Sequence, residues 1–366
     1  MRPVIQFQPR PGILDLGWGH PRPELLPVET WARAATRAAR HFGGQALTYG
    51  YATGPAPLLE WLSAHLNRLE GGGTAPEQTF VTGGASHGLA LVTQVLAAPG
   101  DTVLVDSPTY HLAFRILADR GVSVAAAPEG LDPASLTTRL RTLRASGHRV
   151  PMLYLVPTFG NPTGLSLPDA RRAELISVAR AESLTIVEDD TYRELCYDGT
   201  APASLWRLAG GAPVVRLGSF AKTVAPGLRL GWINADPAVI GALAALGYVD
   251  SGGGVNHSVA MQMAAFGDAG WYDDHLAFVR GQYRAQRDAL AGALGVSAPA
   301  GGWFLWLPMP AGLLPAAEAR GVSFVPGTRF YADGTSGTTR VRLSFSHLSP
   351  ADLRRAAERL TAAVRP

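Results

Sequence analysis

Lys222 is the only lysine in a chain of 366 residues that holds 32 lysine and arginine side chains in total. Arginine serves as well as lysine for surface charge, ion pairs and phosphate binding, whereas only lysine can lose its proton and act as an amine nucleophile. A lysine with a lowered pKa forms Schiff bases with carbonyl groups. The single lysine therefore indicates either amine chemistry or the chance survival of one surface cation, and its surroundings must decide.

Four further segments carry side chains suited to chemistry, and each follows an apolar run. They are GGASHG from Gly83, NPTG from Asn161, EDDTY from Glu188 and GSFAK from Gly218. Taken singly, NPTG is a good turn sequence and EDDTY is typical of an acidic turn that caps a helix. The order of the four segments is therefore more informative than any one of them.

Apolar runs alternate with helical patterns from about Gln78 onward and must position these segments. Strands are predicted at Thr79–Gly83, Thr102–Ser107, Val122–Ala127, Met152–Pro157, Leu184–Asp189 and Val214–Phe220. Helical stretches such as Pro168–Ala181 separate most of them. This alternation is typical of a mostly parallel sheet covered by helices on both faces. Ligands of such sheets bind beyond the carboxyl ends of the strands, which is where the four segments lie.

The two ends of the chain differ from this middle part. The first 43 residues are rich in proline and read as irregular. The chain after Asn256 reads as mainly helical, with one alternating, half-buried strand at Thr338–Ser346. We expect an α/β fold in which a large domain contains the sheet and a smaller α+β domain combines both chain ends. The expected bounds are 44–270 for the large domain, and 1–43 with 271–366 for the small one.

Composition limits the class of protein. Charged residues make up 17% of the chain, and the formal charge of +3 comes from dispersed arginines without the basic runs of nucleic-acid-binding arms. The lone Cys196 excludes an internal disulfide and fits a reducing compartment. The N-terminal sequence lacks a signal-peptide pattern, and no apolar stretch is long enough to span a bilayer. We therefore expect a cytoplasmic protein with neither nucleic-acid nor membrane partners.

The four segments, in this order, resemble those of the class I and II aminotransferases that use pyridoxal 5′-phosphate. The resemblance covers nearly the whole chain, from LDLGWGHPRPELLP near the start to RVRLSFS near the end. It is closest to the branch with aminoadipate and aromatic aminotransferases and the C-terminal domains of MocR-type regulators. It implies a pyridoxal-phosphate-dependent transferase fold, a cofactor-binding large domain, and transfer of an amino group from an amino acid to a 2-oxo acid.

The resemblance assigns catalytic and ring-binding roles to five residues. Lys222 would form the internal aldimine with the cofactor aldehyde and then move the proton of the substrate Cα. Asp189 would keep the pyridine nitrogen protonated, which makes the ring an electron sink. Asn161 and Tyr192 would hydrogen-bond the ring hydroxyl oxygen. Tyr110 would stack on the ring face.

The resemblance also implies a phosphate site. Backbone N–H groups at Ala85 and Ser86 would bind the phosphate at a helix N-terminus, where the helix dipole favours an anion. Ser219 and Arg229 would complete this site. Tyr49 resembles the tyrosine that reaches the phosphate of a neighbouring subunit, so the resemblance implies a homodimer.

Arg342 resembles the arginine that grips the α-carboxylate of the substrate as a bidentate pair. Gly19 would add a backbone N–H, and Asn161 would also face the substrate. The sequence departs from the family pattern at Ala221, where serine is common, and at Gly160, where glutamine or histidine is common. The preferred amino-acid donor is therefore not predicted.

Two alternatives remain open on the sequence. GASHG at Gly84–Gly88 matches G-x-S-x-G between a strand and a helix, as in a serine hydrolase, but that interpretation leaves Lys222, NPTG and DDTY unexplained. A non-catalytic, MocR-like ligand-sensing domain would normally follow a winged helix, for which the sequence before the first family motif leaves no room. The nine histidines lack metal-binding spacing, so no metal site is predicted.

Overall fold

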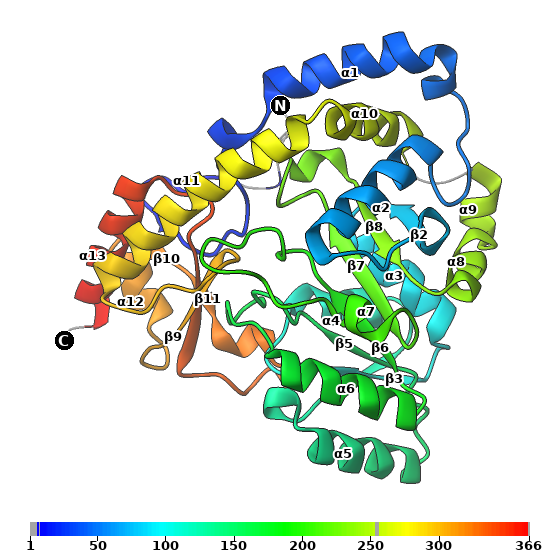
Figure 1. The fold of residues 1–366 in the computed structure, drawn as a ribbon. Coiled ribbons are helices and arrows are strands. Elements are labelled where there is room, and N and C mark those ends of the chain that lie inside the picture. The colour runs from blue at the N-terminus through cyan, green and yellow to red at the C-terminus, as the bar shows by residue number, and fades with distance from the viewer. Residues whose placement is uncertain (1–5, 7, 253–255, 365–366) are drawn as a thin grey trace.

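The computed structural model describes residues 6, 8–252 and 256–364. Its centre is a seven-stranded sheet in the order β2-β8-β7-β6-β5-β3-β4 (Figure 1). The strands are β2 (Thr79–Thr82), β3 (Thr102–Val105), β4 (Ser123–Ala126), β5 (Met152–Leu155), β6 (Thr185–Asp189), β7 (Val214–Ser219) and β8 (Gly231–Asn234). All neighbours pair in parallel except β8, which is antiparallel to both β2 and β7. The predicted α/β fold with a mostly parallel sheet is confirmed, although β8 was not predicted.

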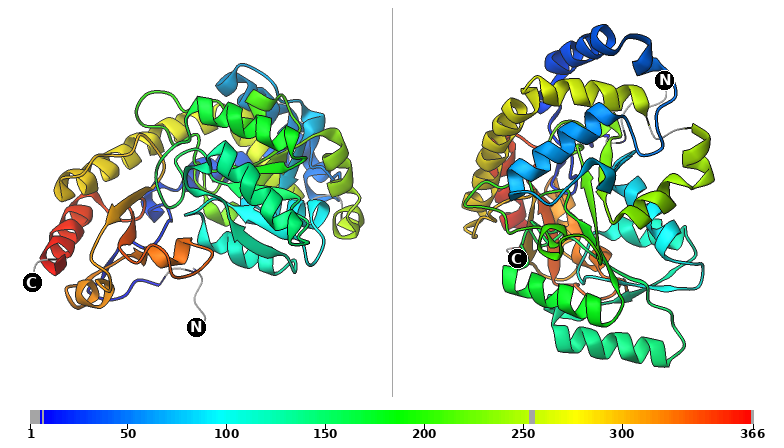
Figure 2. Two further views of the ribbon diagram at one scale, coloured as in Figure 1. Left: turned by 90° about the horizontal axis from the view of Figure 1, so that it is seen from below. Right: turned by 45° about the vertical axis from the view of Figure 1, so that its right-hand side comes forward.

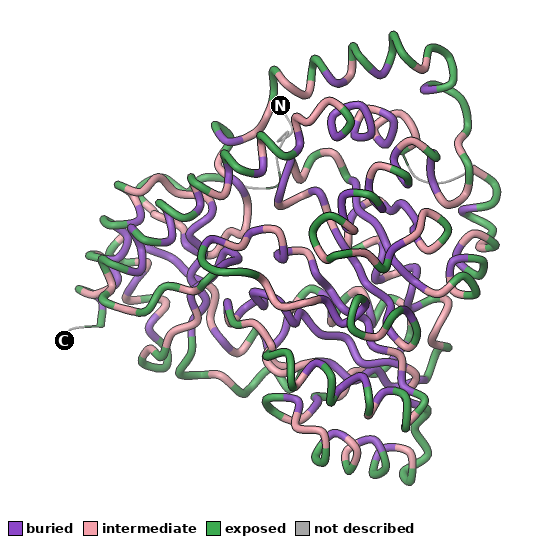
Figure 3. Tube along the Cα trace, viewed as in Figure 1, coloured by how far each residue is buried: buried purple, intermediate pink, exposed green. Residues whose placement is uncertain are grey.

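Helices cover both faces of this sheet, because successive strand residues point to opposite faces and both sets are apolar. In β5, Leu153 and Leu155 belong to one core with α5, α6 and α7, whereas Met152 and Tyr154 belong to the other core with α3 and α4. The buried segments of Figure 3 accordingly follow the strands. The helices of this region are α2 (Ala56–Glu70), α3 (Ala85–Leu96), α4 (His111–Ala118), α5 (Pro133–Ala145), α6 (Asp169–Ala181), α7 (Leu205–Ala209), α8 (Pro237–Ala244) and α9 (Gly247–Gly252).

A second region combines residues from both ends of the chain. Strands β9 (Phe304–Pro308), β11 (Val325–Pro326) and β12 (Arg340–Ser344) form an antiparallel sheet, and β1 (Leu14–Asp15) pairs in parallel with β10 (Val322–Ser323). Its helices are α11 (Trp271–Leu294), α12 (Leu314–Ala319) and α13 (Pro350–Val364). Figure 2 shows α11, in yellow, running from the large sheet region towards α13, in red. The predicted last strand corresponds to β12, whereas β9, β10 and β11 were not predicted.

The expectation that the first 43 residues are irregular was wrong, because they contain helix α1 (Val28–Phe42). Its buried residues Ala34 and Ala38 are spaced as on one helix face, and α1 packs on α10 (His257–Asp268). The prolines that suggested irregular structure all precede the helix, and Pro27 is its N-cap residue. Proline is tolerated at the start of a helix, where a backbone N–H has no intrahelical partner.

Short 3-10 turns connect several of these elements. They lie at Pro23–Leu25, Gly43–Leu47, Pro76–Gln78, Glu129–Leu131, Pro226–Leu228 and Gly327–Phe330. Within the described part of the chain, no helix has the length and apolar character needed to cross a membrane.

Candidate active site

The predicted catalytic residues meet where parallel strands of the central sheet end. Asp189 is the last residue of β6, and Lys222 follows β7 by three residues. Asn161 and Tyr110 lie in the segments after β5 and β3. Because parallel strands bring their carboxyl ends to one edge, four segments far apart in the sequence converge there. Arg342 reaches the same place from β12 of the second region.

The amine of Lys222 lies against aromatic rings in a half-buried position. Its Nζ is 4.9 Å from the ring centroid of Trp303 and 6.0 Å from that of Tyr192. Burial lowers the pKa of Lys222 from 10.5 to about 8, although the nearby carboxylate of Asp189 opposes this shift. A lysine at this pKa has a far larger share of neutral, nucleophilic amine near pH 7 than a solvated lysine has.

The carboxyl group of Asp189 is buried and accepts hydrogen bonds on both oxygens. Tyr154 donates its hydroxyl to Oδ2 at 2.8 Å, and Thr191 donates its hydroxyl to Oδ1 at 2.5 Å. Burial raises the pKa of Asp189, and these hydrogen bonds oppose the increase because they stabilise the anion. Asp189 therefore has the surroundings of a buried acid that is stabilised in its charged form.

Arg342 is a buried cation without an acidic partner among the described residues. Its two terminal nitrogens donate to Oδ1 of Asn161 at 3.0 Å and to the carbonyl oxygen of Gly17 at 2.6 Å, while its buried Nε has no partner. Its guanidinium carbon lies 4.3 Å from the ring centroid of Phe304 and 5.0 Å from that of Phe330. Burial lowers the pKa of Arg342 from 12.5 to about 10. A buried, uncompensated guanidinium is a favourable site for a carboxylate.

Asn161 connects this arginine to Tyr192. Its side chain accepts from Arg342 and forms a hydrogen bond with the Tyr192 side chain. Tyr192 is buried, and burial raises the pKa of its hydroxyl far above the usual value, so the group stays protonated. Asn161 and Tyr192 thus present neutral polar groups between Lys222 and Arg342.

Glycine residues surround the N-terminus of α3, close to Arg229. Gly84, the N-cap residue of α3, has a positive φ of 99°. A Cβ at Gly231 would lie only 2.8 Å from Cα of Gly84, so β8 passes the helix start at a distance that only glycine allows. Arg229 donates to the carbonyl oxygen of Gly83 at 2.8 Å, and Ser219 pairs with Gly231 in the sheet.

The first turn of α3 faces Tyr110. The Tyr110 side chain forms a hydrogen bond with Ser86, the residue that follows Ala85 at the helix start. Burial raises the pKa of the Tyr110 hydroxyl, so this group also stays protonated. Backbone N–H groups, a hydroxyl and a guanidinium therefore meet at one helix N-terminus, which is the donor set that binds an anion.

Two further residues predicted for the site, Tyr49 and Gly19, have other surroundings. Tyr49 is 85% exposed. Gly19 packs against Phe304, since a Cβ at Gly19 would lie 3.1 Å from Cζ of that ring. In the same segment, the carbonyl oxygen of Gly17 accepts a hydrogen bond from Arg342. Sequence reasoning missed Gly17, Trp303 and Phe304, because nothing in a plain glycine or aromatic residue signals a contact from another element.

Ser86, His87 and Asp190 each form hydrogen bonds within the protein. His87, beside Ser86, accepts from the backbone N–H of Gly83 through its Nδ1 at 3.1 Å, and the Ser86 side chain bonds with Tyr110. Asp190, which follows β6, accepts two hydrogen bonds from Arg216, at 2.9 and 2.6 Å. These partners of Ser86 and His87 do not favour the serine-hydrolase alternative.

The donor set suits a phosphorylated aromatic aldehyde. The site combines an amine of lowered pKa, a buried carboxylate, neutral phenols and a helix N-terminus that can bind an anion. Arg342 provides a separate position at which a substrate carboxylate can bind. The described residues contain no group of three or more His, Cys, Asp or Glu placed to hold a metal ion.

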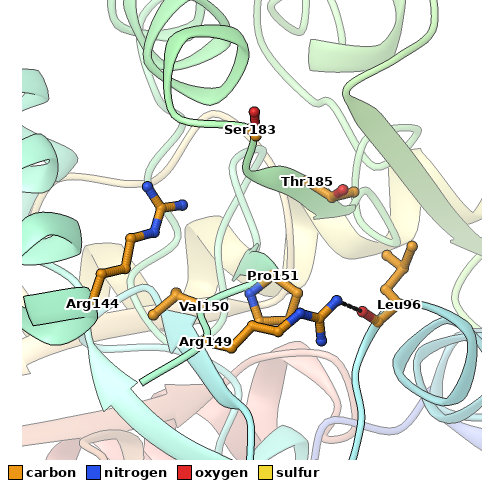
Figure 4. Close-up of a pocket in the computed structure, with 7 residues that line it drawn as sticks. All are labelled: Leu96, Arg144, Arg149, Val150, Pro151, Ser183 and Thr185. Carbon is orange, nitrogen blue, oxygen red and sulfur yellow. Dashed lines mark hydrogen bonds between the residues drawn. The ribbon is translucent and has the colours of Figure 1, made fainter. Parts of the chain in front are cut away.

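A pocket of about 480 Å³ lies elsewhere, near the amino ends of β5 and β6 (Figure 4). Its lining residues are Leu96, Arg144, Arg149, Val150, Pro151, Ser183 and Thr185. Arg144 pairs with Glu182, and Arg149 pairs with Asp101. The pocket contains none of the converging residues described above, so it is separate from the candidate site.

Comparisons with known proteins agree with this geometry. The family model described as aminotransferase class I and II matches residues 11–360. The 2-aminoadipate transaminase of Thermus thermophilus is 34% identical over all of this chain and 93% of that protein. The aromatic-amino-acid aminotransferase 1 of Thermococcus litoralis is 31% identical over all of this chain and 91% of that protein. The crystal structure of Pyrococcus horikoshii kynurenine aminotransferase, complexed with PMP, covers 97% of this chain and 91% of that chain at 29% identity, with a TM-score of 0.89.

Proposed function

Because the chain belongs to the class I and II aminotransferases and is a pyridoxal-phosphate-dependent aminotransferase, we propose that Lys222 is the residue that performs its chemistry. The observation that carries this proposal is the half-buried amine of Lys222, whose pKa lies near 8 beside the carboxylate of Asp189. A lone lysine in such surroundings is suited to bond covalently to an aldehyde.

When bound, pyridoxal phosphate supplies an aldehyde and a protonated pyridine ring that withdraws electrons from the substrate Cα. We propose that Asp189 holds the pyridine nitrogen and that Asn161 and Tyr192 hydrogen-bond the ring hydroxyl oxygen. Tyr110 would cover a ring face. The proposed phosphate-binding residues are Ala85, Ser86, Ser219 and Arg229, together with Tyr49 of a neighbouring subunit.

Lys222 also serves as the acid and base of the proposed reaction. Its free amine would take the proton from the substrate Cα and pass it to the aldehyde-derived carbon of the cofactor. A general base works best when its pKa is close to the operating pH, and the value of about 8 meets this requirement. Trp303 and Tyr192 support this role, because their rings exclude water from one side of the amine.

Arg342 is proposed to hold the α-carboxylate of the amino acid and of the 2-oxo acid. Its buried guanidinium has an unpartnered Nε and no acid to pair with among the described residues. Asn161 would lie beside the same carboxylate, and the backbone N–H of Gly19 would donate a further hydrogen bond to it.

The proposed active unit is a homodimer in the cytoplasm. Tyr49 is 85% exposed, and Leu47 and Tyr51 beside it are 82% and 80% exposed. A cluster of exposed large side chains favours a protein–protein contact. Such a contact would let Tyr49 reach the phosphate of the neighbouring subunit. The lone Cys196, which is not part of a disulfide, supports a reducing compartment.

Single-turnover spectroscopy tests the proposed reaction. Holoprotein mixed with an amino acid should lose its cofactor absorbance band and regain it when a 2-oxo acid is added. The amine that lacks the α-carboxylate is the matched control and should leave the band unchanged on the same timescale. Cofactor bands that no amino acid in a broad panel changes would refute transamination and favour a ligand-sensing role.

A further inference from the structure

Asp189 is held by donors on both of its oxygens, and one of them comes from a strand that none of the recognised motifs includes. Tyr154 of β5 donates its hydroxyl to Oδ2 at 2.8 Å. Thr191 donates its hydroxyl and its backbone N–H to Oδ1, at 2.5 and 3.3 Å. Each carboxylate oxygen has more than one acceptor position, so the carboxylate keeps room for a further donor.

The sheet fixes the position of Tyr154 relative to Asp189. Strands β5 and β6 pair in parallel, with Tyr154 opposite Val187. Asp189 is two residues beyond Val187 and therefore points to the same face of the sheet as Tyr154. Tyr154 is 0% exposed, and burial raises the pKa of its hydroxyl well above 10, so the group remains a hydrogen-bond donor.

These donors counteract the effect of burial on the acid. Burial raises the pKa of Asp189, and the neighbouring carboxylate of Asp190 raises it further, whereas the hydrogen bonds from Tyr154 and Thr191 lower it. Lys222 faces Asp189 from the segment after β7. The other titratable groups facing the acid are the hydroxyls of Tyr110 and Tyr192. A protonated, neutral Asp189 could not form an ion pair with a protonated pyridine ring.

We propose that Tyr154 and Thr191 are positioning residues that keep Asp189 ionised and oriented for the pyridine nitrogen of the cofactor. The inference rests on the proposed cofactor site. It assigns a function to a hydroxyl that touches neither the substrate nor the reacting atoms. Tyr154 acts through Asp189, so its removal weakens cofactor binding while leaving the covalent bond to Lys222 possible.

The test is the dissociation constant of pyridoxal phosphate, measured by fluorescence titration of the apoprotein between pH 5.5 and 8. Tyr154→Phe should weaken binding about tenfold or more, because a hydrogen bond to a charged group contributes more than one to a neutral group. Removing the donor raises the pKa of Asp189, so the loss of affinity on acidification should begin at a higher pH than in the parent. Thr191→Val should act in the same direction, and Thr191→Ser should retain the parent affinity.

Tyr197→Phe is the matched control. Tyr197 is also buried, and its hydroxyl donates to the carbonyl oxygen of Gly302 at 2.6 Å, away from Asp189. This variant should lose stability without any change in the pH dependence of cofactor binding. If Tyr154→Phe does not fold, the comparison of Thr191→Val with Thr191→Ser decides the question.

Parent-like affinity and pH dependence in both Tyr154→Phe and Thr191→Val would overturn the inference. The proposed function fails separately, because it requires borohydride to fix the cofactor on Lys222 in the parent protein. Successful fixation together with unchanged binding in the two variants would therefore reject only the positioning role.

Discussion

At the scale of single residues, the site keeps two basic groups in an unusual state. Other buried cations of this chain are paired with acids, as Arg216 is with Asp190. Lys222 lies against aromatic rings near the carboxylate of Asp189, and Arg342 donates to an amide oxygen and a backbone carbonyl oxygen, with no acidic partner among the described residues. Leaving a buried cation such as Arg342 without an anion costs stability, which favours a ligand that supplies the missing negative charge.

Replacement of Arg342 tests the proposed carboxylate site. Arg342→Ala should reduce kcat/KM for amino acids by about 2–5 kcal/mol in transition-state free energy, as expected when one partner of a buried charged pair is removed. The cofactor spectrum should persist, because Arg342 is not a proposed cofactor ligand. Steady-state kinetics on an amino acid and its decarboxylated amine provide the measurement. An Arg342→Ala variant with parent activity on the amino acid would contradict the assignment.

The lowered pKa of Lys222 predicts a pH-dependent stability of the apoprotein. The pKa falls from 10.5 to about 8 on folding, so between these values the unfolded chain binds more protons than the folded protein. Stability therefore rises with pH across this window, whereas a Lys222→Met variant lacks this contribution. Denaturant unfolding of both apoproteins from pH 7 to 10 should show the parent gaining stability relative to the variant. Parallel curves would show that the pKa is not lowered.

At the residue level, sequence reasoning is most specific where chemistry restricts the residue type. Only lysine can serve as a side-chain amine nucleophile, so Lys222 could be predicted from the sequence, and the structure places it near Asp189. Trp303 and Phe304 were not predicted, because an aromatic residue in a strand or loop is usually a core residue, and only the fold shows that these rings face Lys222 and Arg342. Gly17 was missed because the contact uses its backbone.

At the scale of elements, a buried ion-pair network fixes the strands that carry the site. Arg216 of β7 donates to Asp190, which follows β6, and to Glu70 at the end of α2 at 2.5 Å. Arg193 approaches Glu70 at 3.1 Å. The network thus connects two strands that precede catalytic residues with a helix on the sheet, and it sets the geometry of Asp189 indirectly.

Asp190→Asn should destabilise the protein by about 3–5 kcal/mol, because the buried charges of Arg216 and Arg193 would then share the single carboxylate of Glu70. Asp268→Asn is the control, since the pair of Arg37 and Asp268 is exposed and such pairs contribute about 0–1 kcal/mol. Urea unfolding of the two variants gives the comparison. Equal, small effects would show that the network contributes little to stability.

Helices and strands were predictable from the sequence where the spacing of apolar residues followed one clear pattern. Apolar strands followed by helices predicted the central sheet, but β8 was missed because GWIN lies between loop-like segments and a 3-10 turn, rather than an α-helix, separates it from β7. Helix α1 was missed because prolines before residue 28 suggested irregular structure, although its alanines follow helical spacing. The short strands β1, β10 and β11 form only through pairing with distant segments, which local sequence does not reveal.

At the scale of the whole molecule, the site is built from both regions of one chain and is proposed to be completed by a second chain. Lys222 and Asp189 come from the central sheet, whereas Arg342 and Gly17 come from the region formed by both chain ends. Tyr49, exposed in one subunit, would serve the other. In a two-fold dimer each subunit would contribute this residue to its partner, which gives two equivalent sites.

Tyr49→Phe should weaken cofactor retention without lowering the melting temperature, because an 85% exposed hydroxyl contributes little to the fold of one chain. Cofactor loss during dialysis and sedimentation velocity at assay concentration are the measurements. Tyr248→Phe is a suitable control, since the Tyr248 side chain is 67% exposed and has no proposed cofactor contact. A fully active monomer would rule out the shared site.

The central claim is that Lys222 bonds covalently to the cofactor, and reductive trapping tests it most directly. Holoprotein is reduced with borohydride, digested and analysed by mass spectrometry. Lys222 is the only side-chain amine in the chain, so the account predicts that the cofactor mass is added only to the peptide that contains Lys222. Unmodified Lys222 in a protein that retains cofactor and transaminates would contradict the account.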